Sequence, residues 1–495
     1  MLKPKISALL LLTALSCSHA DRKIASSLEA PPDLGDLLKA SDEILATVEG
    51  AAFDSRVCKS YLGDLETSLD RLDLKTLPLV ELKNNAQAIA DNSWKIRTTL
   101  HSRLKEFDKE CVYQIQSNFR QFRFIEDYLL EIAHDVKATT PDKIDFQNQP
   151  VPILDSTPSY YALRTSASGE KLQFEDGDMF VTRGVSFLSS MIARLGTRAT
   201  QFSHIVFVHK DEKTGQMKTI ESYVGVGVGF YEFDFALKNE NARILWLRSK
   251  DKQLAKKAAQ KITALVKDRI DKKNPIKYDY ELNFNDASTM SCAEVSQVAF
   301  EMASGGKFKI PYYPNEIAGA ESLVSRLKIS PGPTYEPGDM EIDPRFELMG
   351  EFSDLRLTRD SRQKDAIMTA VFSWMNEHDY QLVDTMKSKM AGGVIHKVRR
   401  TFLWPLVQKM LKIDDFSKEI PGNMLSTVQL INQIGEVLVV EMQARDSAFE
   451  KKHGVPMSAL EMSEALESLR AADAKLFENK KTRKQAKFHH MIRAK

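Results

Sequence analysis

Apolar side chains recur with helical spacing in two separate parts of the chain. Between residues 34 and 137 they stand three or four positions apart, as in the run from Phe119 to Ile132, and Pro78 interrupts the pattern. This spacing is typical of amphipathic helices and predicts a bundle of three or four of them. The same spacing returns between residues 358 and 479. A second all-helical region is therefore predicted near the C-terminus.

The part of the chain between these regions, residues 170–344, contains short apolar runs that are typical of strands. Two of them, 202–208 and 217–223, flank the charged stretch 210–215, which ends in glycine and predicts a β-hairpin. The alternating glycines at 225–229 are not followed by a helix. They predict a bent strand that another backbone approaches closely, rather than a phosphate-binding loop.

The register of the hairpin decides which side chains meet. Pairing Lys210 with Gly215 across a four-residue loop sets His204 directly opposite Glu221. Their Cβ atoms would then lie roughly 5 Å apart on one face, close enough for the carboxylate to fix the tautomer of the imidazole. A slip of one residue would separate them onto opposite faces. His209 falls on the other face of its strand and is predicted to be solvated.

A second pattern places a cysteine at the beginning of a helix. Ser291 and Glu294 have the spacing of a capping box, and an apolar helical run follows from Val295 to Met302. Cys292 is therefore predicted in the first turn, where free N–H groups and the helix dipole favour the thiolate. The N–H of Cys292 or Ala293 would also face the oxygen of an attacked carbonyl.

Taken alone, these patterns leave a structural role open. A histidine in an apolar strand is more often a structural residue than a base, and a cysteine near the start of a helix is more often buried and inert.

Composition and spacing predict the remaining segments. Residues 21–33 form a polar tether, and residues 138–169, with four prolines, form a linker. Residues 185–195 and 254–270 are predicted helices, the second with a solvated lysine face. The proline- and glycine-rich stretch that ends at residue 344 either borders a cleft or connects domains.

Two basic segments are candidates for surface contacts. Residues 396–406 combine basic side chains with Phe402, Leu403 and Trp404, which suits an anionic membrane surface, or a helix end that packs into its own bundle. Residues 480–495 carry seven lysines and arginines and no acid. They form a basic tail that either contacts phosphate-rich polymers and lipid headgroups or is simply disordered.

Residues 1–20 have the pattern of an export signal, in which two lysines precede an apolar run from Ile6 to Leu15. Cleavage is expected after Ala20 or before Cys17, since residues 14–17 resemble a bacterial lipobox in which the cysteine is acylated. Either site predicts an exported protein, in the periplasm or anchored to the outer membrane of a bacterial cell envelope as a lipoprotein.

Export changes the interpretation of the four cysteines. With Cys17 lipidated or removed and Cys292 kept for chemistry, Cys58 and Cys111 remain as a pair in a compartment that permits disulfides. Each lies in a helical pattern, so a bridge between neighbouring helices is expected, with two unconnected buried thiols as the alternative.

Length and charge narrow the function classes further. A chain of 495 residues can hold two to four domains with a large core. Its 69 basic and 68 acidic residues leave a net charge of +1, which gives no indication of nucleic-acid binding. No stretch after the export signal is long and apolar enough to span a bilayer.

Five short segments of the middle region resemble, in the same order, those of the circularly permuted NlpC-type, papain-like cysteine hydrolases, the YiiX-like or YebB-like branch. The segments are Gly177-Asp178, Ser203-His204-Ile205, Ile220-Glu221-Ser222 followed by residues 225–228, Tyr278-Asp279, and Cys292-Ala293-Glu294-Val295. The resemblance implies an α+β fold. It would be a permuted papain-like core with an antiparallel sheet and a nucleophile helix, flanked by N-terminal and C-terminal all-helical regions.

The resemblance also implies a mechanism. Cys292 would be the nucleophile, His204 the base and Glu221 the acid that orients it, acting through a thioester without a metal or cofactor. Ala293 and Tyr278 are candidates for contacting the oxyanion, although Tyr278 is equally well explained by core packing. Ala293 and Ser222 depart from the residues usual in the family, which puts the substrate in doubt more than the activity.

We therefore expect an exported cysteine hydrolase that cleaves an amide bond in a cell-wall peptide or a protein. One alternative is a lipid acyltransferase or lipid hydrolase similar to lecithin:retinol acyltransferase, and another is a non-catalytic envelope scaffold. A broad apolar groove beside Cys292 would favour a lipid substrate, and a narrow polar cleft would favour a peptide. Attachment to a membrane surface is a further expectation.

Overall fold

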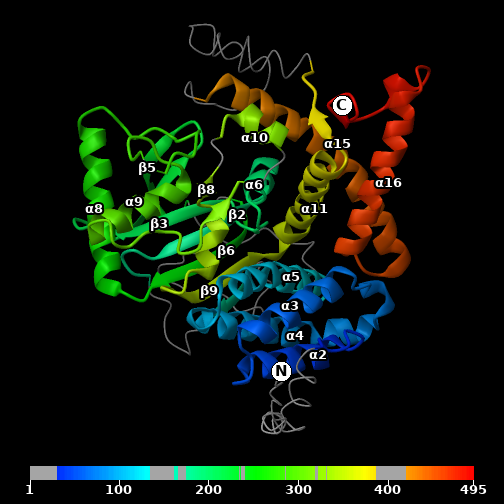
Figure 1. Cartoon of the computed structure of the whole chain (residues 1–495), viewed down its shortest axis with the longest axis horizontal. Helices are drawn as coiled ribbons and strands as arrows, with labels where there is room; N and C mark the ends of the chain where they lie inside the picture. The colour runs from blue at the N-terminus through cyan, green and yellow to red at the C-terminus, as the bar shows by residue number, and fades with distance from the viewer. Residues whose placement is uncertain are drawn as a thin grey trace, which may run out of the picture.

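The computed structural model of the chain describes residues 30–133, 161–165, 174–233, 235, 240–284, 286–317, 321–329, 332–385 and 420–494 (Figure 1). The expected export signal, the lipidation site at Cys17 and the basic segment 396–406 lie outside these residues, as does most of the expected tether.

The segment predicted as a bundle contains four helices, which lie at the bottom of Figure 1. Asp36 and Asp54 begin the first two helices by accepting hydrogen bonds from the N–H groups of Lys39 and Val57. Pro78 precedes the third, in agreement with the break in the pattern. The elements are α2 (Leu37–Glu49), α3 (Ser55–Asp70), η1 (Leu74–Thr76), α4 (Leu79–Ser102), η2 (Leu104–Glu106) and α5 (Lys109–Ala133).

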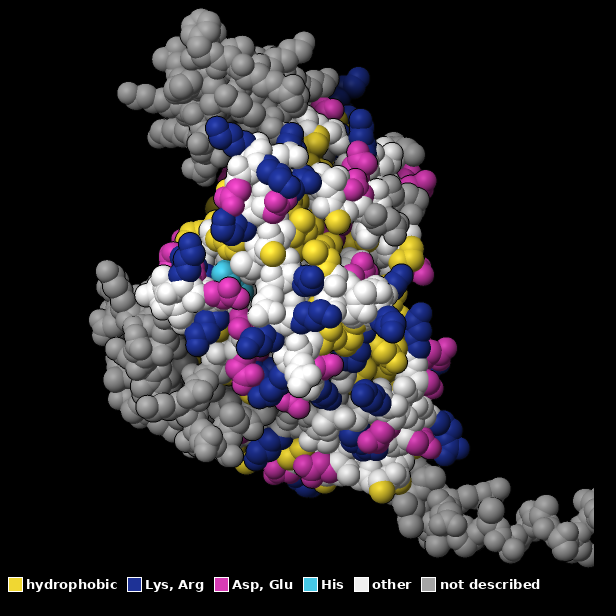
Figure 2. All heavy atoms as spheres, turned by 90° about the vertical axis from the view of Figure 1, so that its left-hand side faces the viewer, with side chains coloured by type: hydrophobic (Ala, Val, Ile, Leu, Met, Phe, Trp, Pro, Cys, Tyr) yellow, Lys and Arg dark blue, Asp and Glu magenta, His cyan; other side chains and the backbone are white. Residues whose placement is uncertain are grey.

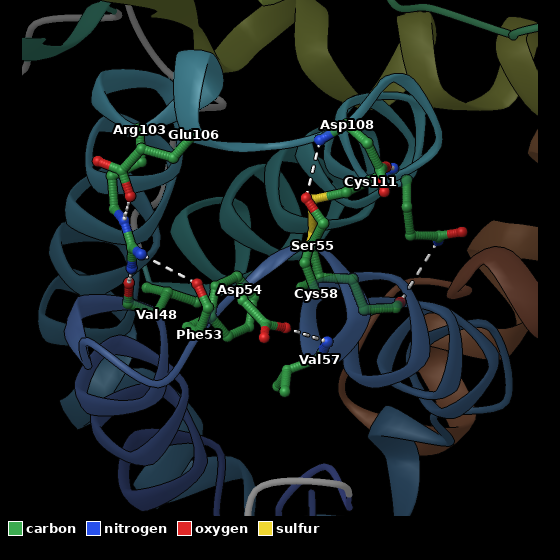
Figure 3. Close-up of a disulfide and its surroundings, with 12 residues drawn as sticks. Val48, Phe53, Asp54, Ser55, Val57, Cys58, Arg103, Glu106, Asp108 and Cys111 are labelled. Carbon is green, nitrogen blue, oxygen red and sulfur yellow. Dashed lines mark hydrogen bonds and ion pairs between the residues drawn. A yellow bond between two sulfur atoms is a disulfide. The ribbon is translucent and has the colours of Figure 1, made fainter.

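A disulfide between Cys58 and Cys111 joins α3 to α5, with the two Cα atoms 5.7 Å apart (Figure 3). Beside it, the N–H of Asp108 donates to Ser55 Oγ at 2.8 Å. Arg103 donates to the carbonyl oxygens of Val48 and Phe53 and ties the neighbouring loop to α4. Closing a loop of this length is expected to stabilise the bundle by about 4 kcal/mol in the chain-entropy treatment.

Seven antiparallel strands form the main sheet, in the order β1-β9-β6-β2-β3-β4-β5. Two pairs of short strands, β7-β8 and β10-β11, lie apart from it. The strands are β1 (Tyr161–Thr165), β2 (Met179–Gly184), β3 (His204–Lys210), β4 (Met217–Tyr223), β5 (Gly227–Glu232), β6 (Asn241–Ser249), β7 (Asn315–Glu316), β8 (Pro333–Thr334), β9 (Phe346–Asp354), β10 (Tyr380–Leu382) and β11 (Ile492–Ala494).

The sheet extends beyond the range 170–344 at both ends. Strand β1 lies in the segment 138–169 that was predicted to be a linker, and β9 follows the predicted end of the core. Prolines marked the linker as irregular, but β1 pairs with β9 over five residues. Backbone pairing with a distant strand leaves no local signal in so short a run.

Two helices cover one face of the sheet, at the left in Figure 1. They are α8 (Lys252–Asp271) and α9 (Cys292–Ser304), and α9 packs on α8, β3 and β4. Their apolar faces share a core with Ile205 and Phe207 of β3 and Ile220 of β4. The lysines of α8 are exposed, as predicted, and Figure 2 shows basic and acidic side chains interspersed over this side of the molecule.

Buried ion pairs join the N-terminal bundle to the sheet. Glu351 of β9 accepts hydrogen bonds from Arg97 of α4 at 2.6 Å and from Arg123 of α5 at 2.9 Å, and Arg243 of β6 lies 3.4 Å from its second oxygen. The other terminal guanidinium nitrogen of Arg97 donates to Glu126 of α5. All of these side chains are at most 4% exposed, so the bundle is fixed to the sheet by charges that water does not screen.

The C-terminal helices form a second apolar core together with α6 and α10. In Figure 1, α11 and α16 lie to the right of the sheet, and α15 runs from above the sheet to its right. The bounds are α6 (Phe187–Ile192), α10 (Glu321–Leu327), η3 (Pro337–Ile342), α11 (Leu355–Glu377), α15 (Gly422–His453), α16 (Ala459–Glu478) and η5 (Arg483–Gln485).

The described part of the basic tail, residues 480–494, is folded. This differs from the prediction that the tail is simply disordered. Strand β11 pairs with β10, and Phe488 stacks on Trp374 of α11 at 5.8 Å. The buried His489 is held by Asp473 at 2.8 Å and by Tyr380 at 3.1 Å. The prediction rested on the number of basic residues and overlooked the apolar side chains that anchor this segment in the second core.

Candidate functional site

The β3–β4 hairpin has a register different from the predicted one. Lys210 pairs with Met217, not with Gly215, so the loop comprises residues 211–216. The N–H of Asp211 donates to Gln216 O across it. The prediction was wrong by two positions, but side chains alternate along a strand with period two, so the shift leaves every residue on its predicted face.

His204 and Glu221 are in contact despite the changed register. Continuing the pairing to the beginning of β3 sets Tyr223 opposite His204, with Glu221 as the diagonal neighbour. His204 Nε2 lies 2.9 Å from Glu221 Oε2. Glu221 is fully buried, whereas the side chain of His204 keeps 17% of its surface exposed. The carboxylate therefore orients an imidazole that still reaches open space.

Sequence reasoning missed two hydroxyl groups that hold Glu221. Thr219 Oγ1 donates to Glu221 Oε1 at 2.6 Å, and the Tyr223 hydroxyl donates to Glu221 Oε2 at 2.6 Å. Both lie two residues from Glu221 on β4, and therefore on the same face. That alternation was the signal in the sequence that could have identified them.

Cys292 is the first residue of α9, as the capping box predicted. The N–H of Ser291 donates to Glu294 Oε2 at 2.7 Å and closes the first turn. Ser222 Oγ donates to Met290 O at 2.6 Å, which ties β4 to the chain just before the cysteine. Cys292 forms no disulfide and is buried, with 7% of the residue exposed, and it lines a pocket.

The side chains of Cys292 and His204 interact directly. Burial lowers the pKa of His204, but the hydrogen bonds and negative charges of Cys292 and Glu221 outweigh it and raise that pKa to about 10. Since Glu221 occupies Nε2, Nδ1 is the ring nitrogen left for the sulfur. The arrangement favours a protonated imidazole beside the sulfur.

A close backbone approach places Tyr278 next to the cysteine. Gly227 of β5 has a φ of 88°, and a Cβ atom there would lie 2.2 Å from Ile276 O. The N–H of Val228 donates to that carbonyl at 2.9 Å. This agrees with the bent, closely approached strand expected at residues 225–229.

Tyr278 faces the same space as Cys292 and Ala293. Burial, followed by the negative charge of Cys292, raises the pKa of Tyr278 well above its usual value. Its hydroxyl therefore stays protonated and remains a donor. The N–H groups of the first turn of α9, Ala293 included, supply further donors at the same place.

A cavity of about 70 Å³ opens beside Cys292, where the two apolar cores meet. Its walls come from α6, the segment before α9, α10, residues 334–337 and α15. Apolar side chains dominate the lining, namely Leu188, Met191, Ile192, Leu195, Val224, Leu282, Leu327, Ile329, Pro337 and Met424. The proline-rich stretch before residue 344 therefore borders the cleft, one of the two roles expected for it.

His209 is not the solvated residue that was predicted. It is 4% exposed and packs against Phe230 at 5.4 Å, and burial lowers its pKa. The face of β3 that carries His209 also carries Ile205 and Phe207, which α8 and α9 cover. A local charged turn gave no indication that distant helices would shield this end of the strand.

Among the residues that the structure describes, no group of three or more His, Cys, Asp or Glu side chains is arranged to hold a metal ion. A search of the same residues for a helix with the length and apolar character needed to cross a membrane finds none.

Comparison with known proteins gives distant structural similarity only. No family model matches the chain, and no match is found among curated proteins. The chain is similar to the crystal structure of the metalloprotein YiiX from Escherichia coli O157:H7, with a TM-score of 0.27 and 17% identity over 35% of this chain and 96% of that chain. The chain has an α+β fold with an antiparallel sheet, and its permuted papain-like connectivity stays a prediction.

Proposed function

We propose that the protein is a cysteine hydrolase or acyltransferase whose substrate carries a hydrocarbon acyl group. Cys292 would be the nucleophile, His204 the proton carrier and Glu221 the group that orients the imidazole. The observation that carries the proposal is that His204, paired with Glu221, neighbours Cys292, which itself lines an apolar pocket. Export to a bacterial cell envelope, expected from residues 1–20, belongs to the same proposal.

The chemistry proceeds in two steps. The Cys292 thiolate attacks the carbonyl carbon, and the negative charge that develops on the carbonyl oxygen faces the N–H groups of the first turn of α9. The imidazolium of His204 gives its proton to the departing alcohol or amine, which leaves a thioester. His204 then takes a proton from water, or from an acceptor alcohol or amine, and the attack of that group releases the acyl product and restores the thiolate and the imidazolium.

The lining of the pocket supports a lipid substrate over a peptide. Burying a hydrocarbon chain against these side chains removes apolar surface from water at about 25 cal/mol per Å². A peptide would need partners for its backbone N–H and C=O groups, and an apolar wall offers few of them. A cell-wall peptide, the substrate first expected from the sequence, therefore becomes the second arm of the test.

Turnover of defined substrates tests this proposal. Purified protein and its Cys292→Ala variant are incubated with phospholipids, medium-chain p-nitrophenyl esters, N-acyl amides and cell-wall peptides, and products are followed by mass spectrometry. We expect acyl release from lipid or ester substrates by the parent only. Cleavage of peptides alone would replace the substrate class, whereas equal turnover by Cys292→Ala would remove Cys292 from the mechanism. A complete lack of turnover with every substrate would favour a scaffold.

A variant that fills the pocket tests where the acyl chain lies. Met424 of α15 is a partly exposed lining residue, and Met424→Trp adds bulk to that wall. We expect kcat/KM to fall about tenfold for long acyl chains, equivalent to losing roughly two buried CH₂ groups, with short chains little affected. Val440→Trp on the same helix is the control, because Val440 is 63% exposed. An equal loss for long and short chains would place the chain elsewhere.

A further inference from the structure

Tyr223 contacts both members of the His–Glu pair. Its ring stacks on the imidazole of His204, with centroids 4.9 Å apart and an interplanar angle of 22°. Its hydroxyl donates to Glu221 Oε2, the oxygen that also receives His204 Nε2. One side chain therefore restricts the rotation of the imidazole and directs the carboxylate that holds it.

The carboxylate of Glu221 is held at both oxygens. Tyr223 and His204 occupy Oε2, and Thr219 occupies Oε1 at 2.6 Å. Because Glu221 is fully buried, losing one of these donors would leave charge that water does not reach. The carboxylate could then turn toward other partners and release the ring of His204.

The register of the hairpin puts Tyr223 in this position. The six-residue loop sets Tyr223, rather than Glu221, across from His204. Neighbouring aromatic rings hold Tyr223 from the other side, Tyr231 at 5.1 Å and Phe235 at 6.1 Å. The stack on His204 is therefore supported by a cluster that continues to the surface, where Phe235 is 45% exposed.

We infer that Tyr223 is a positioning residue that sets the orientation of His204 toward Cys292, with Thr219 supporting it through Glu221. The inference rests on the proposed function, because it assigns a role within the same assembly. Tyr223 acts through the histidine and not on the substrate. Its hydroxyl keeps the carboxylate in the plane of the imidazole, and its ring limits how far the imidazole turns.

Alkylation of Cys292 by iodoacetamide tests the role of Tyr223 independently of any substrate. The rate is measured from pH 5 to 10 for the parent, Tyr223→Phe and Tyr231→Phe, alongside kcat and KM for the best ester. Tyr223→Phe keeps the ring and removes only the hydroxyl. We expect the pH midpoint of alkylation to move to higher pH, because the imidazole is less well placed beside the sulfur. We also expect kcat to fall about tenfold with KM unchanged.

Control variants separate this inference from the proposed function. Tyr231→Phe removes a hydroxyl on the next strand and is expected to leave the midpoint unchanged. Thr219→Val is expected to shift it in the same direction as Tyr223→Phe, and Thr219→Ser to restore it. If Tyr223→Phe lowers the unfolding temperature but leaves the midpoint and kcat unchanged, Tyr223 is merely structural and the inference is overturned. If His204→Ala itself leaves the midpoint unchanged, the Cys–His assembly fails, and the proposed function with it.

Discussion

Replacing His204 with asparagine is expected to lower kcat by about 10²- to 10⁴-fold, the range attributed to a positioned proton carrier. Asparagine retains a polar group near Glu221 but accepts and returns no proton. The sulfur of Cys292 also loses its cationic neighbour, so its alkylation should become slower and need higher pH. The measurement is kcat on the best acyl substrate together with the iodoacetamide rate against pH.

The pKa of His204 gives this prediction a direction on the pH axis. Burial lowers the pKa, but Cys292 and Glu221 raise it to about 10, so the imidazolium needed for proton donation persists to that pH and is lost above it. Since the folded pKa is raised, the contribution of this group to stability is present below about pH 6.5 and is lost as the pH rises toward 10. Glu221→Gln removes one of the charges that raise the pKa of His204. The alkaline limb of the plot of kcat against pH should therefore move to lower pH. An unchanged limb in that variant would contradict the role assigned to the carboxylate.

Replacing Glu351 with glutamine is expected to destabilise the fold by about 3 to 5 kcal/mol, because it removes one partner of a buried ion network. Glu351 is fully buried and lies within hydrogen-bonding or ion-pair distance of Arg97, Arg123 and Arg243. Glutamine preserves the shape of the side chain but leaves these guanidinium groups with one negative charge fewer. The shift is measured as the change in the midpoint of urea unfolding.

An exposed ion pair provides the matched comparison for Glu351. Asp271 of α8 pairs with Lys267 four residues away, and both side chains are about 60% exposed. Asp271→Asn is expected to leave the unfolding midpoint unchanged, since exposed pairs contribute little. If Glu351→Gln behaved in the same way, the bundle would not depend on these charges for its attachment to the sheet.

The two helical regions are parts of the site as well as its surroundings. The N-terminal bundle anchors β9 and β6 through the charges around Glu351, and those strands support β2 and β3 in turn. The C-terminal helices supply Met424 and, with α10, one wall of the pocket beside Cys292. A fragment limited to residues 170–344 would lack β9 and part of that wall. We therefore expect the chemistry to depend on the long chain.

Local patterns identified the three central side chains because each depends on short-range rules. The capping box put Cys292 at the beginning of α9, since Ser291 and Glu294 meet within one helical turn. The period of two kept His204 and Glu221 on one face even though the loop was longer than predicted. The same rules did not reveal how His204 and Cys292 approach each other, because 88 residues of chain separate them and only packing of α9 on β3 and β4 brings them together.

The sequence by itself determined the helical and β-rich regions, the helix that begins at Cys292 and the shared face of His204 and Glu221. Those features follow from propensity, capping and alternation within a few residues. Only the tertiary structure decided that Tyr223 lies across from His204, that His209 is buried, that β1 and β9 complete the sheet and that an apolar pocket adjoins the sulfur. The position of Tyr223 depends on how the six-residue loop folds, and the other three features depend on contacts between segments far apart in the chain. No local pattern of residues encodes which distant surface will cover them.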